Sequence, residues 1–189
     1  MLTDPHICRH PLERLVSCYK DKILGAKAGT VHDKLRRRIT LKYRPGSQLP
    51  KDSRGLPELP RIKKLPKEFI PTYVEFIQYI VDEAAEEKVP DMHWAPVYSF
   101  CNPCQVNINT IAKIETLEED TNFILKKINV AKDQIGFSKK NSAADGKSAN
   151  EVTNSYLKTL DSGLYQKLVD LYVIDFDILG YKPLTYEEL

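Results

Sequence analysis

Arg9 and Ser17 are the side chains whose types and spacing best suit the binding of an anion. Arg9 follows an apolar lead-in, Pro11 stands at a natural first helical position, and apolar residues then recur at helical spacing (Leu12, Leu15, Val16, Tyr19, Ile23). An arginine at a helix N-terminus adds its charge to free N–H groups that already favour an anion. Ser17 lies off the apolar face, roughly 9 Å along the helix axis from Pro11. The pair therefore predicts a site for a terminal phosphate, although an ordinary surface helix shows the same spacing.

The elements that must position this pair alternate between extended and helical patterns, which predicts an α/β fold. A short strand at residues 6–8 precedes the first helix, which ends near Gly25. Thr72 is expected to cap a helix that runs through about residue 85. Arg14, on the first helix, either supports the anion site or pairs with a helix acid, and we favour the second interpretation.

The second half of the chain repeats the alternation. A strand at 111–115 precedes a helix that the T-x-x-E sequence of Thr116 and Glu119 predicts to begin with a capping box. This helix is expected to run through Phe123, Ile124 and Ile128. Residues 138–155 are rich in Ser, Asn and Lys and predict a loop, and Gly180 is expected to end the ordered chain.

Composition limits the classes of function. At 189 residues and 42% hydrophobic content, the chain predicts one domain over residues 1–189. The net charge is only +2, yet residues 34–67 hold twelve Lys or Arg against two acids. Part of this stretch, about 44–67, predicts a basic, proline-rich loop suited to a polyanion. It lacks the interleaved aromatic residues of a single-strand binder, so we expect no nucleic-acid partner. No secretory signal and no apolar run of membrane-spanning length is present.

Four sequence blocks resemble one known family. The first is R-H-P-L-E-R-L-V-S-x-Y-K-D-K, from Arg9 to Lys22. H-W-A-P with C-N-P-C spans 93–104, I-A-K-I-E-T-L-E-E-D spans 111–120, and L-Y-V-I-D-F-D-I-L-G-Y ends at Tyr181. In this order they resemble the Golgi carbohydrate sulfotransferases of the chondroitin 4-O-sulfotransferase and HNK-1 sulfotransferase group.

The resemblance implies a P-loop-like sulfotransferase fold and transfer of a sulfuryl group to a glycan hydroxyl. The donor is 3′-phosphoadenosine 5′-phosphosulfate, its 3′-phosphate is held by Arg9 and Ser17, and no metal is required. The implied acceptor is glycosaminoglycan-like. The implied location is the lumenal side of the Golgi membrane, to which the full-length protein is anchored.

The family's 3′-phosphate motif is preceded by a strand and by a lysine-bearing loop that holds the 5′-phosphosulfate. Only eight residues precede Arg9, and none of them is lysine. We therefore expect this chain to be the C-terminal portion of such a domain, without that strand and loop. A chain that lacks this part of the donor site can be inactive on its own.

His93 and the cysteines carry the remaining chemistry. Sulfuryl transfer needs a base near the accepting hydroxyl, and His93 suits that role, with Trp94 offering a face on which a sugar ring can stack. The alternative is a histidine with satisfied hydrogen bonds beneath a packed tryptophan.

Cys101 and Cys104 lack a second pair for zinc and a following helix for redox chemistry. The remaining interpretation is a structural pair of cysteines, which can form a local disulfide in the oxidising compartment that the resemblance implies.

Two functions follow from these observations. The first is a carbohydrate sulfotransferase, or the greater part of one. The second is a non-catalytic module of the same ancestry that binds an acidic glycan or a partner through residues 34–67.

Overall fold

The computed structural model describes residues 6–45, 69–101, 103, 105, 108, 110–130 and 148–189. These residues form a mostly helical structure with a small parallel sheet. The predicted combination of strands and helices is present, but helices dominate it. Strand β1 (His6–Cys8) pairs in parallel with β2 (Ile111–Lys113), with Ile7 opposite Ala112. The basic loop predicted at about 44–67 lies almost wholly outside the described residues.

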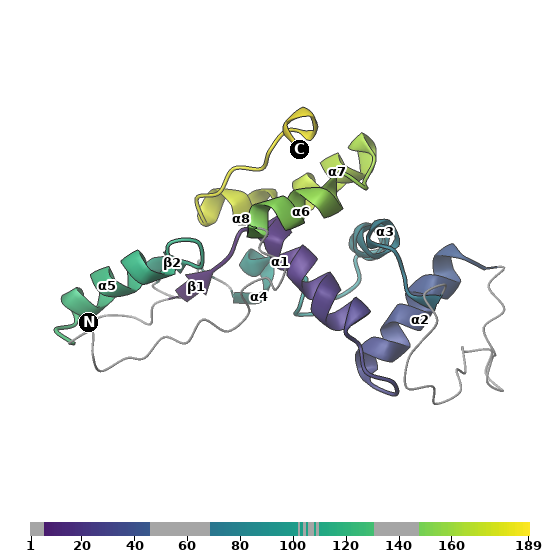
Figure 1. Ribbon diagram of the computed structural model, residues 1–189, viewed down its shortest axis with the longest axis horizontal. Helices are drawn as coiled ribbons and strands as arrows, with labels where there is room; N and C mark the ends of the chain where they lie inside the picture. The colour runs from purple at the N-terminus through teal and green to yellow at the C-terminus, as the bar shows by residue number, and fades with distance from the viewer. Residues whose placement is uncertain are drawn as a thin grey trace.

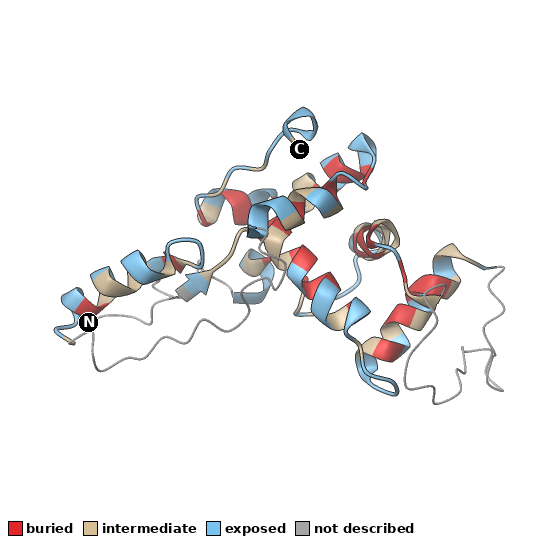
Figure 2. Ribbon diagram, viewed as in Figure 1, coloured by how far each residue is buried: buried red, intermediate tan, exposed pale blue. Residues whose placement is uncertain are grey.

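Helix α1 (Pro11–Cys18) lies at the centre of the structure (Figure 1). Proline opens it as predicted, and the chain continues as the π-helix η1 (Tyr19–Leu24) before it ends at Gly25. The whole predicted apolar face is buried (Leu12, Leu15, Val16, Tyr19, Ile23). Figure 2 shows this buried face continuing into the neighbouring helices.

The core lies on both sides of α1 and η1. Helix α2 (Val31–Tyr43) packs against η1 and α3 (Tyr73–Ala85), and α3 in turn packs against α7 (Ser162–Leu171). Helix α6 (Ala149–Leu157) packs against α1. The remaining elements are α4 (Val97–Cys101), α5 (Leu117–Lys127), α8 (Val173–Ile178) and the 3₁₀-helix η4 (Tyr186–Glu188).

The predicted cap of α3 is confirmed. The Thr72 hydroxyl accepts the backbone N–H of Glu75, and the Glu75 carboxylate accepts the backbone N–H of Thr72. The capping box predicted for α5 is wrong: the Thr116 hydroxyl donates to Asp120 at 2.7 Å and does not cap the helix. Asp120 also accepts the backbone N–H of Lys113, so it closes the turn between β2 and α5.

Helix α5 follows the predicted course through Phe123 and Ile124, with Ile128 at its C-cap, and it buries Leu125. Two further predictions need correction. Helix α6 begins inside the loop predicted at 138–155, because Ser148 and Glu151 form a capping box there. Gly180 takes a left-handed φ of 64° but does not end the ordered chain. The chain continues to η4, which is tied back by hydrogen bonds from Tyr165 to the carbonyl of Leu184 and from Tyr186 to that of Leu160.

Candidate functional site

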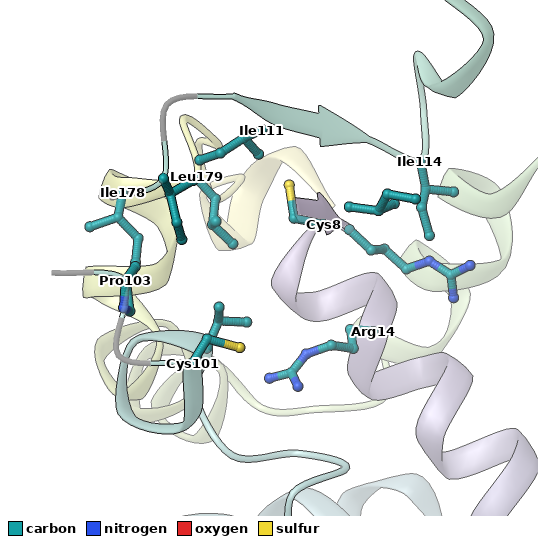
Figure 3. Close-up of a pocket in the computed structure, with 12 residues that line it drawn as sticks. Cys8, Arg14, Cys101, Pro103, Ile111, Ile114, Ile178 and Leu179 are labelled. Carbon is teal, nitrogen blue, oxygen red and sulfur yellow. The ribbon is translucent and has the colours of Figure 1, made fainter. Parts of the chain in front are cut away.

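A cavity of about 620 Å³ opens where β1 meets α1 (Figure 3). Its walls come from β1, α1, α4, β2 and α8 and are largely aliphatic. Arg9 and Arg14 line it, and no carboxylate is among the described residues that do so. Two guanidinium groups in an apolar cavity favour a ligand that combines an anionic group with an apolar surface.

Arg9, the predicted anion-binding residue, is half-buried beside the N-terminus of α1. Ser17 is exposed on α1, as its position off the apolar face predicts, but it does not line this cavity. The structure therefore brings Arg9 together with Arg14. The joint action of Arg9 and Ser17 on one ligand remains a prediction.

The expectation that Arg14 pairs with a helix acid is wrong, because its partner is a backbone carbonyl. One terminal N–H of its guanidinium donates to the backbone carbonyl of Ala95, and its buried Nε has no partner among the described residues. Figure 3 shows the guanidinium pointing from α1 into the cavity toward Cys101. Arg14 thus joins the helix of the first sequence block to the segment after His93.

Glu115 fixes the backbone next to Arg9. Its carboxylate accepts the backbone N–H of His10 at 3.1 Å and the hydroxyl of Tyr181 at 2.8 Å. Partial burial opposes ionisation of Glu115, but these hydrogen bonds outweigh it and hold its pKa below the ordinary value. The His10 ring packs edge-on against Phe176 and Tyr181, so His10 is structural, at the junction of the first, third and fourth sequence blocks.

A carboxylate orients His93, the predicted base. Nδ1 of His93 lies 2.6 Å from Oδ1 of Asp91, which also accepts the backbone N–H of His93 at 2.9 Å. Burial of Asp91 opposes its ionisation, yet the two hydrogen bonds hold its pKa below the ordinary value. An ionised Asp91 favours the tautomer with the proton on Nδ1, which leaves Nε2 as an acceptor.

Trp94 does not offer a face to a sugar ring. Its side chain is only 2% exposed and packs edge-on against Phe76 at 5.8 Å between ring centroids. The packed-tryptophan alternative is therefore correct for Trp94. For His93, whose side chain is one-third exposed and hydrogen-bonded to Asp91, the catalytic and the structural interpretation both stay open.

Two residues that the sequence analysis did not single out hold the segment after His93. The buried carboxylate of Asp175 accepts the backbone N–H groups of Val97 at 2.7 Å and Tyr98 at 2.9 Å. The hydroxyl of Tyr172 donates to the carbonyl of Trp94. Both residues belong to the L-Y-V-I-D-F block near the C-terminus, and an acid within an otherwise apolar run was the signal that could have indicated Asp175.

Two of the described cysteines have thiols that burial makes harder to ionise. Burial raises the pKa of Cys18 to about 12 and also raises that of Cys8. Cys101 is exposed, and its proposed partner Cys104 lies outside the described residues, so their pairing remains a prediction.

In the part of the chain that is described, no group of three or more His, Cys, Asp or Glu side chains is placed to hold a metal ion. No helix there is long and apolar enough to cross a membrane.

Comparison with known proteins supplies evidence of the family that does not depend on the geometry of the site. The family model described as "Sulfotransferase family" matches residues 3–182. Carbohydrate sulfotransferase 11 of Rattus norvegicus is 27% identical over 183 residues, which is 96% of this chain and 47% of the relative. Carbohydrate sulfotransferase 9 of Homo sapiens is 30% identical over 174 residues, 92% of this chain and 36% of the relative. Carbohydrate sulfotransferase 14 of Danio rerio is 30% identical over 173 residues, 92% of this chain and 42% of the relative.

The chain thus spans about half, or less, of the length of these curated relatives. No solved structure matches it.

Proposed function

This chain belongs to the sulfotransferase family, and we propose from that premise that it is part of a carbohydrate sulfotransferase acting on a glycan hydroxyl. The observation that carries the proposal is the placement of Arg9 and Arg14 in a cavity with no described carboxylate, at the N-terminus of α1. The alternative, a binding module without catalysis, receives no comparable support, because an oriented histidine is also present.

The donor in this family is 3′-phosphoadenosine 5′-phosphosulfate, which supplies an activated sulfuryl group when bound. The residues present fit its 3′-phosphate: Arg9, which lines the cavity, can form two charge-assisted hydrogen bonds, and Ser17 is exposed on α1, the helix that follows Arg9. Glu115 holds the backbone N–H of His10, so the chain that carries Arg9 is fixed before any ligand binds. Preorganisation of this kind lowers the entropic cost of binding.

His93 is proposed to accept the proton of the attacking glycan hydroxyl on Nε2. As the oxygen of that hydroxyl forms its bond to sulfur, the bond from sulfur to the 5′-phosphate oxygen breaks, and adenosine 3′,5′-bisphosphate leaves. Asp91 holds the imidazole through Nδ1 and stabilises the positive charge that the ring acquires. The acceptor glycan, the Golgi location and the membrane anchor of the whole protein are part of this proposal.

Donor recognition can be tested by calorimetric titration of the 189-residue chain with two nucleotides that differ only in the 3′-phosphate. We expect adenosine 3′,5′-bisphosphate to bind about a hundredfold more tightly than adenosine 5′-monophosphate, because Arg9 forms a bidentate pair with the additional group. Arg9→Ala should remove most of this preference, and Ser17→Ala part of it. Lys20→Ala, which removes an exposed charge from η1, should change nothing. Equal binding of the two nucleotides by folded wild-type chain would refute the proposal.

The role of His93 calls for a separate assay of sulfuryl transfer by the protein that contains this chain. His93→Asn retains a polar side chain but provides no base, so transfer at saturating acceptor should slow by about a hundredfold or more. Binding of adenosine 3′,5′-bisphosphate should remain as in the wild type. An unchanged rate of transfer would show that another group takes the proton.

A further inference from the structure

Arg14 belongs both to the cavity that contains Arg9 and to the contacts that hold the segment after His93. We propose that Arg14 is a positioning residue that transmits the binding of an anion in this cavity to the imidazole of His93. Since the cavity is taken as the donor site and His93 as the base, this role rests on the proposed function.

The guanidinium of Arg14 keeps its charge available for a ligand. Within the described residues Arg14 forms no salt bridge, and no carboxylate among them lines the cavity into which it points (Figure 3). A guanidinium has five N–H donors in a planar fork, and one terminal nitrogen of Arg14 donates to the carbonyl of Ala95. The other terminal nitrogen can therefore bind an anionic oxygen while the bond to Ala95 stays in place.

Ala95 is the last residue of a hydrogen-bonded turn that carries His93. The backbone carbonyl of Asp91 accepts the N–H groups of Trp94 at 3.0 Å and of Ala95 at 2.8 Å. The carboxylate of Asp91 accepts the backbone N–H of His93 at 2.9 Å and lies 2.6 Å from Nδ1 of its ring. Asp91 thus both closes the turn and orients the imidazole, so a displacement of Ala95 is passed to His93 through this one residue.

Tyr172 and Arg14 hold this turn through two of its carbonyls, and they differ in what they can respond to. Tyr172 donates its hydroxyl to the carbonyl of Trp94, is fully buried and does not line the cavity. Arg14 donates to the carbonyl of Ala95, is half-buried and lines the cavity. Tyr172 is therefore a fixed contact, whereas Arg14 is the contact that an anion in the cavity can influence.

A bound phosphate restricts the guanidinium of Arg14. Hydrogen bonds between a guanidinium and a phosphate are charge-assisted and roughly twice as strong as those between neutral groups. The anion therefore narrows the positions open to the guanidinium, and with them those of the Ala95 carbonyl and of the turn behind it. His93 is not among the described residues that line the cavity, so we expect its response to a nucleotide there to pass through the protein.

The test is NMR of the carbon-13-labelled histidine rings of the 189-residue chain, titrated with adenosine 3′,5′-bisphosphate. His93→Asn identifies the signal of His93 among the four histidines, and we expect this signal to shift as the nucleotide saturates the wild type. Arg14→Gln keeps a donor for the carbonyl of Ala95 but loses the charge. It should weaken nucleotide binding by about tenfold and leave the His93 signal unmoved at saturation. Arg14→Lys keeps the charge but not the planar fork, so it should bind the nucleotide with a small loss of affinity and also leave His93 unmoved.

Ser17→Ala is the matched control, because it removes a predicted contact with the 3′-phosphate but keeps Arg14. Its affinity for the nucleotide should fall, while its His93 signal at saturation should shift as in the wild type. A wild-type His93 signal that stays in place while the nucleotide binds, or a full shift in the folded Arg14 variants, would overturn the role of Arg14 and leave donor recognition intact. Absence of nucleotide binding by the folded wild type would instead refute the donor site, and the role of Arg14 with it.

Discussion

Arg9 owes its position to a residue more than one hundred positions away in the sequence. Glu115 follows β2, and the parallel pairing of β2 with β1 brings its carboxylate to the backbone N–H of His10. Tyr181 then donates its hydroxyl to the other oxygen of the same carboxylate. One side chain therefore connects three of the sequence blocks that resemble the family, and a role in positioning Arg9 explains why these blocks accompany one another.

The depressed pKa of Glu115 predicts how stability depends on pH. Because ionised Glu115 is favoured in the folded state, its contribution is complete above the ordinary pKa of 4.5 and is lost as pH falls through the lower folded-state value. Glu115→Gln removes this titration, so its melting temperature should fall less than that of the wild type between about pH 6 and pH 3. Glu119→Gln, on the exposed first turn of α5, is the control. Parallel melting curves for the wild type and Glu115→Gln would contradict this account.

At the scale of elements, the segment from Trp94 to Tyr98 is held by other elements rather than by its own sequence. Arg14 of α1, Tyr172 at the junction of α7 and α8, and Asp175 of α8 all hydrogen-bond its backbone. Since His93 immediately precedes this segment, the same contacts hold the backbone next to the proposed base.

Asp175→Ala should separate α8 from α4. The substitution leaves the backbone N–H groups of Val97 and Tyr98 without their acceptor, so we expect the free energy of unfolding to fall by about 2 kcal/mol. Urea denaturation measures this loss. Asp170→Ala, at an exposed position on α7, should change stability by less than about 0.5 kcal/mol. A comparable loss in both variants would mean that the two hydrogen bonds contribute little.

Local signals predicted the elements well where one turn contained all the partners. Thr72 and Glu75 are three residues apart, and their capping box is confirmed. Thr116 and Glu119 have the same spacing, but Asp120 competes for the Thr116 hydroxyl because it also closes the turn after β2. The partner of Arg14 could not be predicted, because a backbone carbonyl has no side-chain signature and Ala95 lies 81 positions away.

At the scale of the whole molecule, the charge pattern predicted less than the structure shows. The sequence presents residues 34–67 as one basic stretch, yet within its described part most cations are paired with carboxylates of α2 and α3. Only the folded arrangement shows which of these cations are paired with carboxylates. The exposed position of Ser17 and the place of Arg9 at a helix start, in contrast, follow from helical periodicity alone.

The measurement that tests the central claim most directly is phosphorus-31 NMR of adenosine 3′,5′-bisphosphate titrated with the 189-residue chain, since the two phosphates give separate signals. The account predicts that the signal of the 3′-phosphate shifts and broadens on binding, and that Arg9→Ala abolishes this response in a chain that remains folded. A response confined to the 5′-phosphate, or a 3′-phosphate response that survives Arg9→Ala, would contradict it.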